Sequence, residues 1–340
     1  MRALICDEFG HLPDAIRVAD CPAPEAPGPG EVLIDVAYAS VSHATGLMIE
    51  GRYQTRPPRP FSPGTEAVGH VRAIGPGVRR LRPGQAVVAI ADWGCHAEQV
   101  CVREATVYPV PEGLPLLQAL PVPLSYGTAY TALLWRARLR PGDTVLVLGA
   151  GAGVGLAAVE IASRLGAEVI ACASTPAKRE AALARGARHA IAPDDDLAAQ
   201  VKTITQGRGA DIVLDPVGGA LAERAVRAAA ANAHLLSIGF ASGQLPALPA
   251  NLLLVKNLTL HGVFFGRYIG WTPQDEREAH APALQRVMQT LLGWALDGHL
   301  RPTVSKVFAF DELPAALTAL ESRQVVGKVA LAVGPDSRPA

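Results

Sequence analysis

The stretch that most constrains this chain runs from Thr144 to Cys172 and places a glycine-rich turn between two apolar segments. Thr144–Leu148 is apolar and β-branched without polar alternation, as expected of a strand buried on both faces of a parallel sheet. Glycine occupies every second position of Gly149–Gly155, and apolar residues then recur at helical spacing until Gly166. Glu168–Cys172 is a second apolar segment. The stretch predicts a strand–turn–helix–strand unit whose helix N-terminus can bind a phosphate or pyrophosphate.

The glycine pattern departs from a strict dinucleotide fingerprint. When a G-x-G-x-x-G frame is anchored on Gly155, Ala150 and Ala152 take its first two glycine positions. An ordinary tight turn would account for the glycines alone, but the flanking strands and helix favour dinucleotide binding. The predicted contacts with the dinucleotide lie in the turn, at Ala150, Gly151, Ala152, Gly153, Val154 and Gly155.

The end of the second strand indicates which dinucleotide binds. NAD-binding proteins usually place Asp or Glu about 20 residues beyond the turn, where it holds the ribose hydroxyls. Here that position is Ser174, and its neighbours Thr175, Lys178 and Arg179 include no acid. Hydroxyls and cations suit a 2′-phosphate, so the sequence predicts NADPH as the cofactor. The same residues could also cap the next helix, and the two roles are compatible.

Composition limits the other functions that the chain could have. Its 340 residues suit two domains, and its formal net charge of +0 gives no electrostatic reason for a nucleic-acid or membrane partner. No uninterrupted apolar run approaches ~18 residues, so no membrane span is predicted. Five scattered cysteines without a CxxC motif favour reduced thiols, and no signal peptide is recognisable. A cytoplasmic location is therefore expected.

Strand and turn patterns predict two different domains. The first ~110 residues contain short strands between Pro/Gly turns, including a half-buried strand at Glu31–Tyr38, and indicate a β-rich barrel or sandwich. From Gln118 onward strands and helices alternate, which predicts a doubly wound parallel sheet. Ligands bind outside the carboxyl ends of such strands, so Val217, Gly239 and Phe264–Phe265 join the predicted cofactor contacts.

The C-terminal part changes character again. Residues 267–280 are polar and charged and form a candidate lid, and Pro282–Leu296 is typical of an amphipathic helix. We expect this part to fold back onto the first domain, which would place the active site in a cleft between the two domains.

Six motifs follow one another along nearly the whole chain: PGTEAVGHV, RPGQAV, GTAYTALL, GAGAGVGLAAVEIA, LDPVGG and ESRQVVGKVAL. In this order they resemble the medium-chain dehydrogenase/reductase superfamily, and most closely its zinc-independent NADPH:quinone oxidoreductases. The resemblance implies a GroES-like catalytic domain at 1–122 plus 267–340, with a Rossmann NADPH-binding domain inserted at 123–266. It also implies a small-molecule electron acceptor and a homodimer or homotetramer paired through the Rossmann domain.

The resemblance also bears on metal binding. Zinc alcohol dehydrogenases of the same superfamily carry a catalytic Cys and His where this chain has Ser42 and Thr65. Of the family's Gly-His-Glu run only Glu66 is present, and one carboxylate does not hold a catalytic zinc ion, which needs about three protein ligands. No metal site is predicted.

The same resemblance implies roles for individual residues. Tyr53 matches the proton-donating tyrosine of related 2-enoyl thioester reductases, although aromatic packing accounts for it equally well. Ser42 stands where the quinone reductases carry Asn, and it can still donate a hydrogen bond. Thr128 matches the residue beside the nicotinamide carboxamide, and Lys178 and Arg323 match cations at the 2′-phosphate.

The predicted reaction is hydride transfer from NADPH to a quinone or an α,β-unsaturated carbonyl compound without zinc. Tyr53 or a water is the candidate acid, and Ser42 and backbone N–H groups are candidate donors to the developing oxyanion. Two alternatives stay open. One is a 2-enoyl thioester reductase, in which arginines near Tyr53 would bind a carrier phosphate, and the other is a protein that binds NADPH without turnover.

Overall fold

The computed structural model describes residues 1–194, 196–322 and 325–334, and the chain divides into two compact units. Unit 1 comprises Met1–Leu124, Gly266–Gly298 and the described part of Pro302–Ala340, and unit 2 comprises Ser125–Phe265 and His299–Arg301. The chain therefore runs through five segments and passes between the units four times. We propose that these units correspond to the predicted domains, whose boundaries at 122 and 267 stay a prediction.

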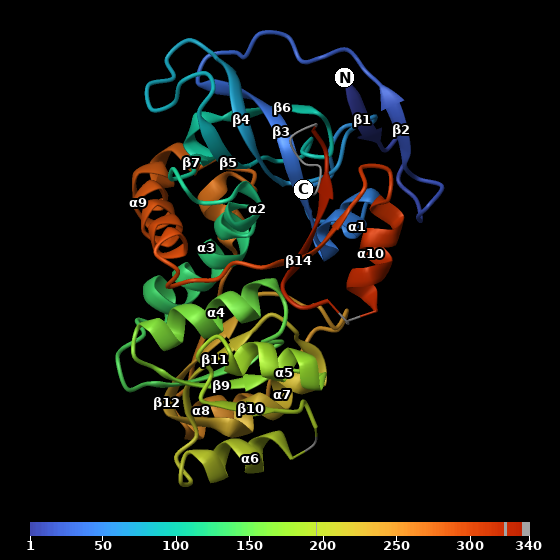
Figure 1. Cartoon of the computed structure of the whole chain (residues 1–340). Helices are drawn as coiled ribbons and strands as arrows, with labels where there is room; N and C mark the ends of the chain where they lie inside the picture. The colour runs from blue at the N-terminus through green and yellow to red at the C-terminus, as the bar shows by residue number, and fades with distance from the viewer. Residues whose placement is uncertain (195, 323–324, 335–340) are drawn as a thin grey trace. The chain divides into compact units, whose positions relative to one another are not determined.

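Unit 2 is built on a six-stranded parallel sheet with the strand order β10-β9-β8-β11-β12-β13. Its strands are β8 (Thr144–Leu148), β9 (Glu168–Cys172), β10 (His189–Ile191), β11 (Ala210–Asp215), β12 (Ala229–Ser237) and β13 (Thr259–Gly262). Its helices are α3 (Gly127–Tyr130), η3 (Thr131–Arg136), α4 (Gly153–Arg164), α5 (Pro176–Leu183), α6 (Leu197–Ile204), α7 (Gly219–Ala228) and α8 (Ala250–Val255). Helices α4 and α6 lie on opposite sides of this sheet (Figure 1). The predicted doubly wound sheet is confirmed.

Strand β8 is the centre of unit 2. All five of its residues are buried because the sheet is covered on both faces, as its unbroken apolar run predicts. The strand order reverses at β8, since β9 and β10 follow on one side and β11 to β13 on the other. A reversal of this kind opens a crevice at the carboxyl ends of the strands.

Unit 1 contains a seven-stranded sheet with the main order β14-β15-β3-β4-β5-β7, in which β6 also pairs with β3, and a separate two-stranded sheet of β1 and β2. Its strands are β1 (Arg2–Ile5), β2 (Arg17–Asp20), β3 (Glu31–Val41), β4 (Glu66–Ile74), β5 (Ala86–Ile90), β6 (Gln99–Arg103), β7 (Val107–Pro109), β14 (Val304–Phe308) and β15 (Lys328–Ala332). Its helices are α1 (His43–Ile49), η1 (Glu104–Thr106), α2 (Leu116–Ala119), α9 (Arg277–Leu296) and α10 (Leu313–Glu321). Two further helical turns, η2 (Val122–Tyr126) and η4 (Phe265–Ile269), span the points where the chain changes unit.

Two predicted elements are confirmed, but the burial predicted for the first and the starting residue predicted for the second were wrong. The half-buried strand predicted at Glu31–Tyr38 is the longer β3, whose residues are nearly all shielded because it pairs with β4, β6 and β15. The amphipathic helix predicted to begin at Pro282 is α9, which begins at Arg277 and keeps Pro282 within it. No helix among the described residues is long and apolar enough to cross a membrane.

Candidate functional site

The glycine-rich turn connects β8 to α4, and its close fit is set by backbone atoms. Gly149 has a φ of +62°, a conformation that L side chains rarely adopt. A Cβ on Gly155 would lie 2.2 Å from the carbonyl oxygen of Gly149 and 3.0 Å from the Cα of Ala150. Only glycine fits at 155, because these obstacles are backbone atoms that cannot rotate away. The turn therefore presents the N-terminus of α4 at the carboxyl edge of the sheet, where backbone N–H groups can bind pyrophosphate.

The two alanines in the fingerprint frame are explained by the same geometry. Ala152 precedes α4 with φ −115° and ψ 168°, an extended conformation that any residue adopts, and it is exposed. Ala150 is fully buried. The positive φ that the turn needs is supplied by Gly149, one position before the frame begins, so neither alanine strains the backbone.

The other predicted cofactor residues of unit 2 follow neighbouring strands. Val217 comes after β11, Gly239 after β12, and Phe264 and Phe265 after β13. Since these strands are parallel, the structure brings all four residues to the edge that carries the glycine-rich turn. Phe264 is 40% exposed, whereas Phe265 is buried.

Asp215, which sequence reasoning did not single out, shapes the loop at Val217. Its Oδ1 accepts hydrogen bonds from the backbone N–H groups of Val217 and Gly218, at 2.8 and 2.9 Å. Burial raises the pKa of this carboxyl, and the two N–H donors act against the rise. Thr128 lies in the short helix α3 and is largely buried.

The sequence allows the segment after β9 two roles, helix capping and phosphate binding. Thr175 caps α5, because its Oγ1 accepts the backbone N–H of Lys178 at 3.3 Å. Lys178 also packs on the glycine-rich turn: a Cβ on Gly151 would lie 2.5 Å from its Cβ and Cγ. Ser174 is exposed in the same segment. The capping interpretation is thus confirmed for Thr175, and Lys178 lies beside the turn.

Three charged groups act on the thiol at the end of β9. Burial raises the pKa of the Cys172 thiol to about 12, Asp194 adds to that rise, and Arg224 and Arg179 oppose it. Arg224 comes from α7, about 50 residues from β9 in sequence, and no local pattern indicated it. Arg323, predicted at the 2′-phosphate, lies outside the described residues.

The two catalytic candidates flank helix α1 of unit 1. Ser42 precedes the helix, and its backbone N–H donates to Thr45 Oγ1 at 3.3 Å while Thr45 N–H donates to the Ser42 carbonyl at 3.0 Å. Tyr53 follows the helix, where its N–H donates to the carbonyl of Leu47 at 3.0 Å. Burial raises the pKa of the Tyr53 phenol, and a hydrogen bond with Gln54 acts in the opposite direction. The phenol keeps its proton at neutral pH, as any tyrosine does, and its raised pKa makes it a weaker acid than an ordinary tyrosine.

The environment of Tyr53 contains an aromatic neighbour that the sequence did not suggest. The indole of Trp271 meets the ring edge to face, with centroids 6.5 Å apart and an interplanar angle of 84°. Tyr53 also packs against the apolar core of unit 1. Aromatic packing is thus confirmed for this tyrosine, and its chemical role stays a prediction.

Glu66 and His96 are the most deeply buried polar groups near the start of β4. Glu66 is 1% exposed, and its carboxylate lies 2.6 Å from Lys328 Nζ and accepts the Leu124 N–H at 2.9 Å. His96 is fully buried, its Nε2 lies 3.1 Å from the Ser40 carbonyl oxygen, and burial lowers its pKa to about 4. Within the described ranges no three His, Cys, Asp or Glu residues are placed to hold a metal ion.

Comparison with known proteins identifies the family. Residues 28–112 match the sequence family "Alcohol dehydrogenase GroES-like domain", and residues 153–285 match "Zinc-binding dehydrogenase". The chain is 32% identical over 334 residues to quinone oxidoreductase-like protein 2 of Rattus norvegicus, covering 98% of this chain and 92% of that protein. The chain belongs to the zinc-independent quinone oxidoreductases of the medium-chain dehydrogenase/reductase superfamily.

Solved structures of this superfamily agree with the fold of the chain. The quinone oxidoreductase of Thermus thermophilus, solved alone and in complex with NADPH, is similar with a TM-score of 0.81 and 34% identity over 98% of this chain and 100% of that one. An NAD-dependent alcohol dehydrogenase is similar with a TM-score of 0.86 and 30% identity over 98% and 100%. The chain is therefore an oxidoreductase of a superfamily that uses nicotinamide cofactors.

In this member of the zinc-independent quinone oxidoreductases, Glu66 forms an ion pair with a lysine. The Glu66 carboxylate, which the resemblance matches to a zinc-ligand run, is paired with Lys328. An ammonium group at 2.6 Å supplies the positive charge that a buried carboxylate needs.

Proposed function

We propose that this oxidoreductase transfers a hydride from NADPH to a quinone or an α,β-unsaturated carbonyl acceptor without zinc. The observation that carries the choice of NADPH is the loop after β9, where Ser174 stands in place of an acid and Lys178 packs on the glycine-rich turn. Arg179 and Arg224 act on the Cys172 thiol at the same strand end, where they oppose the action of Asp194, and cations favour a 2′-phosphate. Asp194 follows β10 instead, and its carboxylate accepts from Gln200 Nε2 at 2.8 Å.

The chain offers a cradle that fits such a dinucleotide. The backbone at the start of α4 would hold the pyrophosphate, because Gly155 allows the close turn that aims its N–H groups at the sheet edge. Lys178 and Ser174 would hold the 2′-phosphate, and Thr128, Val217 and the residues after β12 and β13 would bound the nicotinamide end. A bound reduced nicotinamide supplies the hydride.

Unit 1 would supply a proton donor and a hydrogen-bond donor for the acceptor. A quinone that receives a hydride needs one proton to become a hydroquinone, and an enone that receives it at the β-carbon needs one proton at the resulting enolate. Tyr53 is the proposed donor, because it matches the proton-donating tyrosine of related thioester reductases and a phenol carries its proton at neutral pH. The hydroxyl of Ser42 is the proposed hydrogen-bond donor to the carbonyl oxygen of the acceptor.

We also propose that two or four copies associate through unit 2. Strand β13 is the last strand of its sheet, and an end strand leaves backbone groups open to another chain. Exposed large apolar side chains stand on β13 itself and in the preceding helix α8: Leu254, Val255 and Leu260. Exposed apolar side chains at the edge of a sheet favour an interface there. Sedimentation of the purified protein measures the state, and the cytoplasmic location stays a prediction.

An acceptor screen tests the proposed function. The purified protein is mixed with NADPH or NADH and a benzoquinone, a simple enone or a crotonyl thioester, and loss of the reduced nicotinamide absorbance is followed. We expect NADPH to be preferred and the quinone or enone to be reduced. Faster reduction of the crotonyl thioester would favour a thioester reductase, and tight NADPH binding without oxidation by any acceptor would favour a binding protein.

The role of Tyr53 is tested by Tyr53→Phe, with Tyr38→Phe on β3 as the control. The raised pKa means that the acid form persists until the pH exceeds the ordinary tyrosine range, so enone reduction by the native protein should fall only at strongly alkaline pH. The variant should lose about 100-fold in kcat for the enone and lose this alkaline fall, while NADPH affinity stays the same. Unchanged turnover would remove Tyr53 as the acid.

A further inference from the structure

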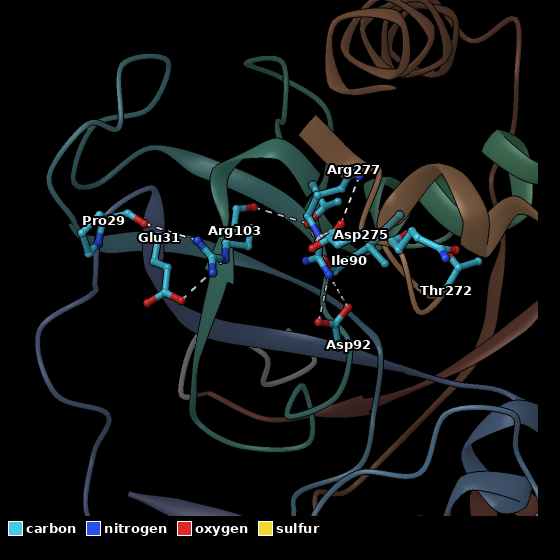
Figure 2. Close-up of polar contacts among 10 residues, drawn as sticks. Pro29, Glu31, Ile90, Asp92, Arg103, Thr272, Asp275 and Arg277 are labelled. Carbon is cyan, nitrogen blue, oxygen red and sulfur yellow. Dashed lines mark hydrogen bonds and ion pairs between the residues drawn. The ribbon is translucent and has the colours of Figure 1, made fainter. Parts of the chain in front are cut away.

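The segment that follows η4 in unit 1 ends at a buried arginine, Arg277. Arg277 is the first residue of α9 and only 7% exposed. Its Nη2 donates to both carboxylate oxygens of Asp92 at 3.0 Å, and its Nε donates to Asp275 at 2.9 Å. Figure 2 shows the guanidinium between these two carboxylates. The two ends of the contact with Asp92 are 185 residues apart in sequence, so this pair fastens the segment to the loop after β5.

The turn before Arg277 packs closely against the arginine side chain at Gly270. Gly270 has a φ of +89°, and a Cβ at this position would lie 2.5 Å from both Arg277 Nη2 and Asp275 Oδ1. Burial lowers the pKa of the guanidinium, but the hydrogen bonds and charges of Asp275 and Asp92 outweigh it, so the net shift is upward. We call Gly270, Arg277, Asp92 and Asp275 the arginine clamp. A buried, fully paired arginine of this kind holds one geometry, because its planar fork fits carboxylates in few orientations.

The arginine clamp fixes the position of the neighbouring residue Trp271. The backbone N–H of Trp271 donates to the Gly266 carbonyl at 2.8 Å, and the next residue back is Gly270 of the clamp. The indole then meets the ring of Tyr53 edge to face, with centroids 6.5 Å apart. Its Nε1 is buried and has no hydrogen-bond partner among the described residues. An unpartnered buried donor is unfavourable unless something else accepts its hydrogen bond.

We propose that Trp271 is a specificity-determining residue and that Arg277 is its positioning residue. In this arrangement the indole N–H donates to the carbonyl oxygen of a flat conjugated acceptor, whose ring packs beside the Tyr53–Trp271 pair. The indole and the phenol then favour planar aromatic quinones over acyclic enones, since offset aromatic contacts add to apolar burial. This inference rests on the proposed function, which supplies the acceptor class.

Two substitutions of Trp271 test the selection itself. Trp271→Phe keeps an aromatic ring without the N–H, and Trp271→Leu removes both. The readout is the ratio of kcat/KM for 9,10-phenanthrenequinone to that for pent-3-en-2-one, both with NADPH. We expect the ratio to fall about fivefold in Trp271→Phe and further in Trp271→Leu, mainly through KM for the quinone. Equal losses for both acceptors, or an unchanged ratio, would overturn the proposal.

The clamp is tested by Arg277→Gln and Arg277→Lys, with Arg72→Gln as the matched control. Arg72 pairs with Asp35 on the same unit, but this pair is exposed. Arg277→Gln should lower the acceptor ratio as Trp271→Phe does, and Arg277→Lys should restore part of it because the charge remains. Arg72→Gln should leave the ratio unchanged. A normal ratio in folded Arg277→Gln would contradict the positioning role.

A measurement without an acceptor separates this inference from the proposed function. Acrylamide quenching of tryptophan fluorescence, compared with and without Trp271→Phe, isolates the signal of Trp271. In Arg277→Gln this signal should become about twofold more accessible, whereas Arg72→Gln should not change it. If the native protein reduces no acceptor, the proposed function and the acceptor class both fail. If it reduces them and the Trp271 signal is unaffected by Arg277→Gln, the clamp alone fails.

Discussion

The two units hold their functional residues by different means. In unit 2 the glycine-rich turn is fixed by backbone atoms a few residues apart, such as Gly155 against the carbonyl of Gly149. In unit 1 the corresponding fixing is done by charged side chains that are distant in sequence: Asp92 with Arg277, and Glu66 with Lys328, which are 262 residues apart. The glycine-rich turn of unit 2 should therefore be disrupted by substitutions that add atoms. The ion pairs of unit 1 should be disrupted by substitutions that remove a charge.

The largest effect is expected from breaking the buried pair of unit 1. Lys328→Met leaves the Glu66 carboxylate buried without its cation and should lower the free energy of unfolding by about 3–5 kcal/mol. Urea unfolding followed by tryptophan fluorescence measures this, since Trp93, Trp271 and Trp294 all belong to unit 1. Adding Glu66→Leu to Lys328→Met should recover most of the loss. A double variant no more stable than the single one would show that packing, and not the lone charge, is responsible.

The next effect in size is a dependence of stability on pH. Burial lowers the pKa of His96 from 6.5 to about 4, so the folded state keeps the ring neutral while the unfolded state accepts a proton. The contribution is present above pH 6.5 and is lost as the pH falls toward 4, with a total of about 3 kcal/mol. In His96→Gln this part of the decline should disappear, whereas substitution of the exposed His11 should leave it. An equal acid decline in His96→Gln would assign it to other groups.

A smaller effect is expected from adding a methyl group to the glycine-rich turn. Gly155→Ala places a Cβ 2.2 Å from the Gly149 carbonyl oxygen, so the backbone has to shift and the unfolding free energy should fall by about 1–3 kcal/mol. NADPH binding, measured by calorimetry, should weaken with it. Ala152→Gly is the control, because Ala152 is exposed and extended, and its NADPH affinity should stay close to that of the native protein. If Ala152→Gly weakened NADPH binding more than Gly155→Ala does, the turn would not be fixed by the backbone contact of Gly155.

The smallest effect concerns which cofactor binds. Lys178→Ala should weaken NADPH about tenfold and leave NADH unchanged, since only NADPH carries the 2′-phosphate. Arg224→Gln should act in the same direction and less strongly, because Arg224 Nη2 donates to the carbonyl of Pro193 at 3.5 Å, in the loop after the neighbouring strand β10. Substitution of exposed Lys202 in α6 provides the control. Equal loss for both cofactors in Lys178→Ala would remove the 2′-phosphate assignment.

Local sequence patterns correctly predicted those features that depend on residues close together in the chain. The β8–α4–β9 unit and the capping role of Thr175 follow from apolar spacing, glycine and hydroxyl positions within one short stretch. The alanine-rich segment shows the limit of such reasoning. The sequence predicts a helix over Ala220–Ala231, but α7 ends at Ala228 and β12 begins at Ala229, because pairing with β11 overrides the helical propensity of alanine.

Contacts between distant segments could not be predicted in this way. Nothing near Arg277 indicates Asp92 as its partner, and nothing near Tyr53 indicates Trp271. The sequence marks Glu66 only as part of a run that binds metal in related proteins, and its pairing with Lys328 depends on β15 joining the same sheet as β4. Each of these contacts requires the chain to return to unit 1 after unit 2 is complete.

That return has a consequence for dissecting the protein. His299–Arg301 belong to unit 2, where the Arg301 N–H donates to both oxygens of Glu160 at 3.1 and 3.2 Å. Glu160 also accepts the Tyr126 hydroxyl at 2.6 Å and lies within α4. A fragment cut as 125–265 would therefore lack one donor to a buried carboxylate in the helix that opens the nucleotide cradle. A fragment meant to contain all of unit 2 therefore has to include His299–Arg301 as well as 125–265. Unit 2 is thus connected to unit 1 at more than the two ends of one inserted segment.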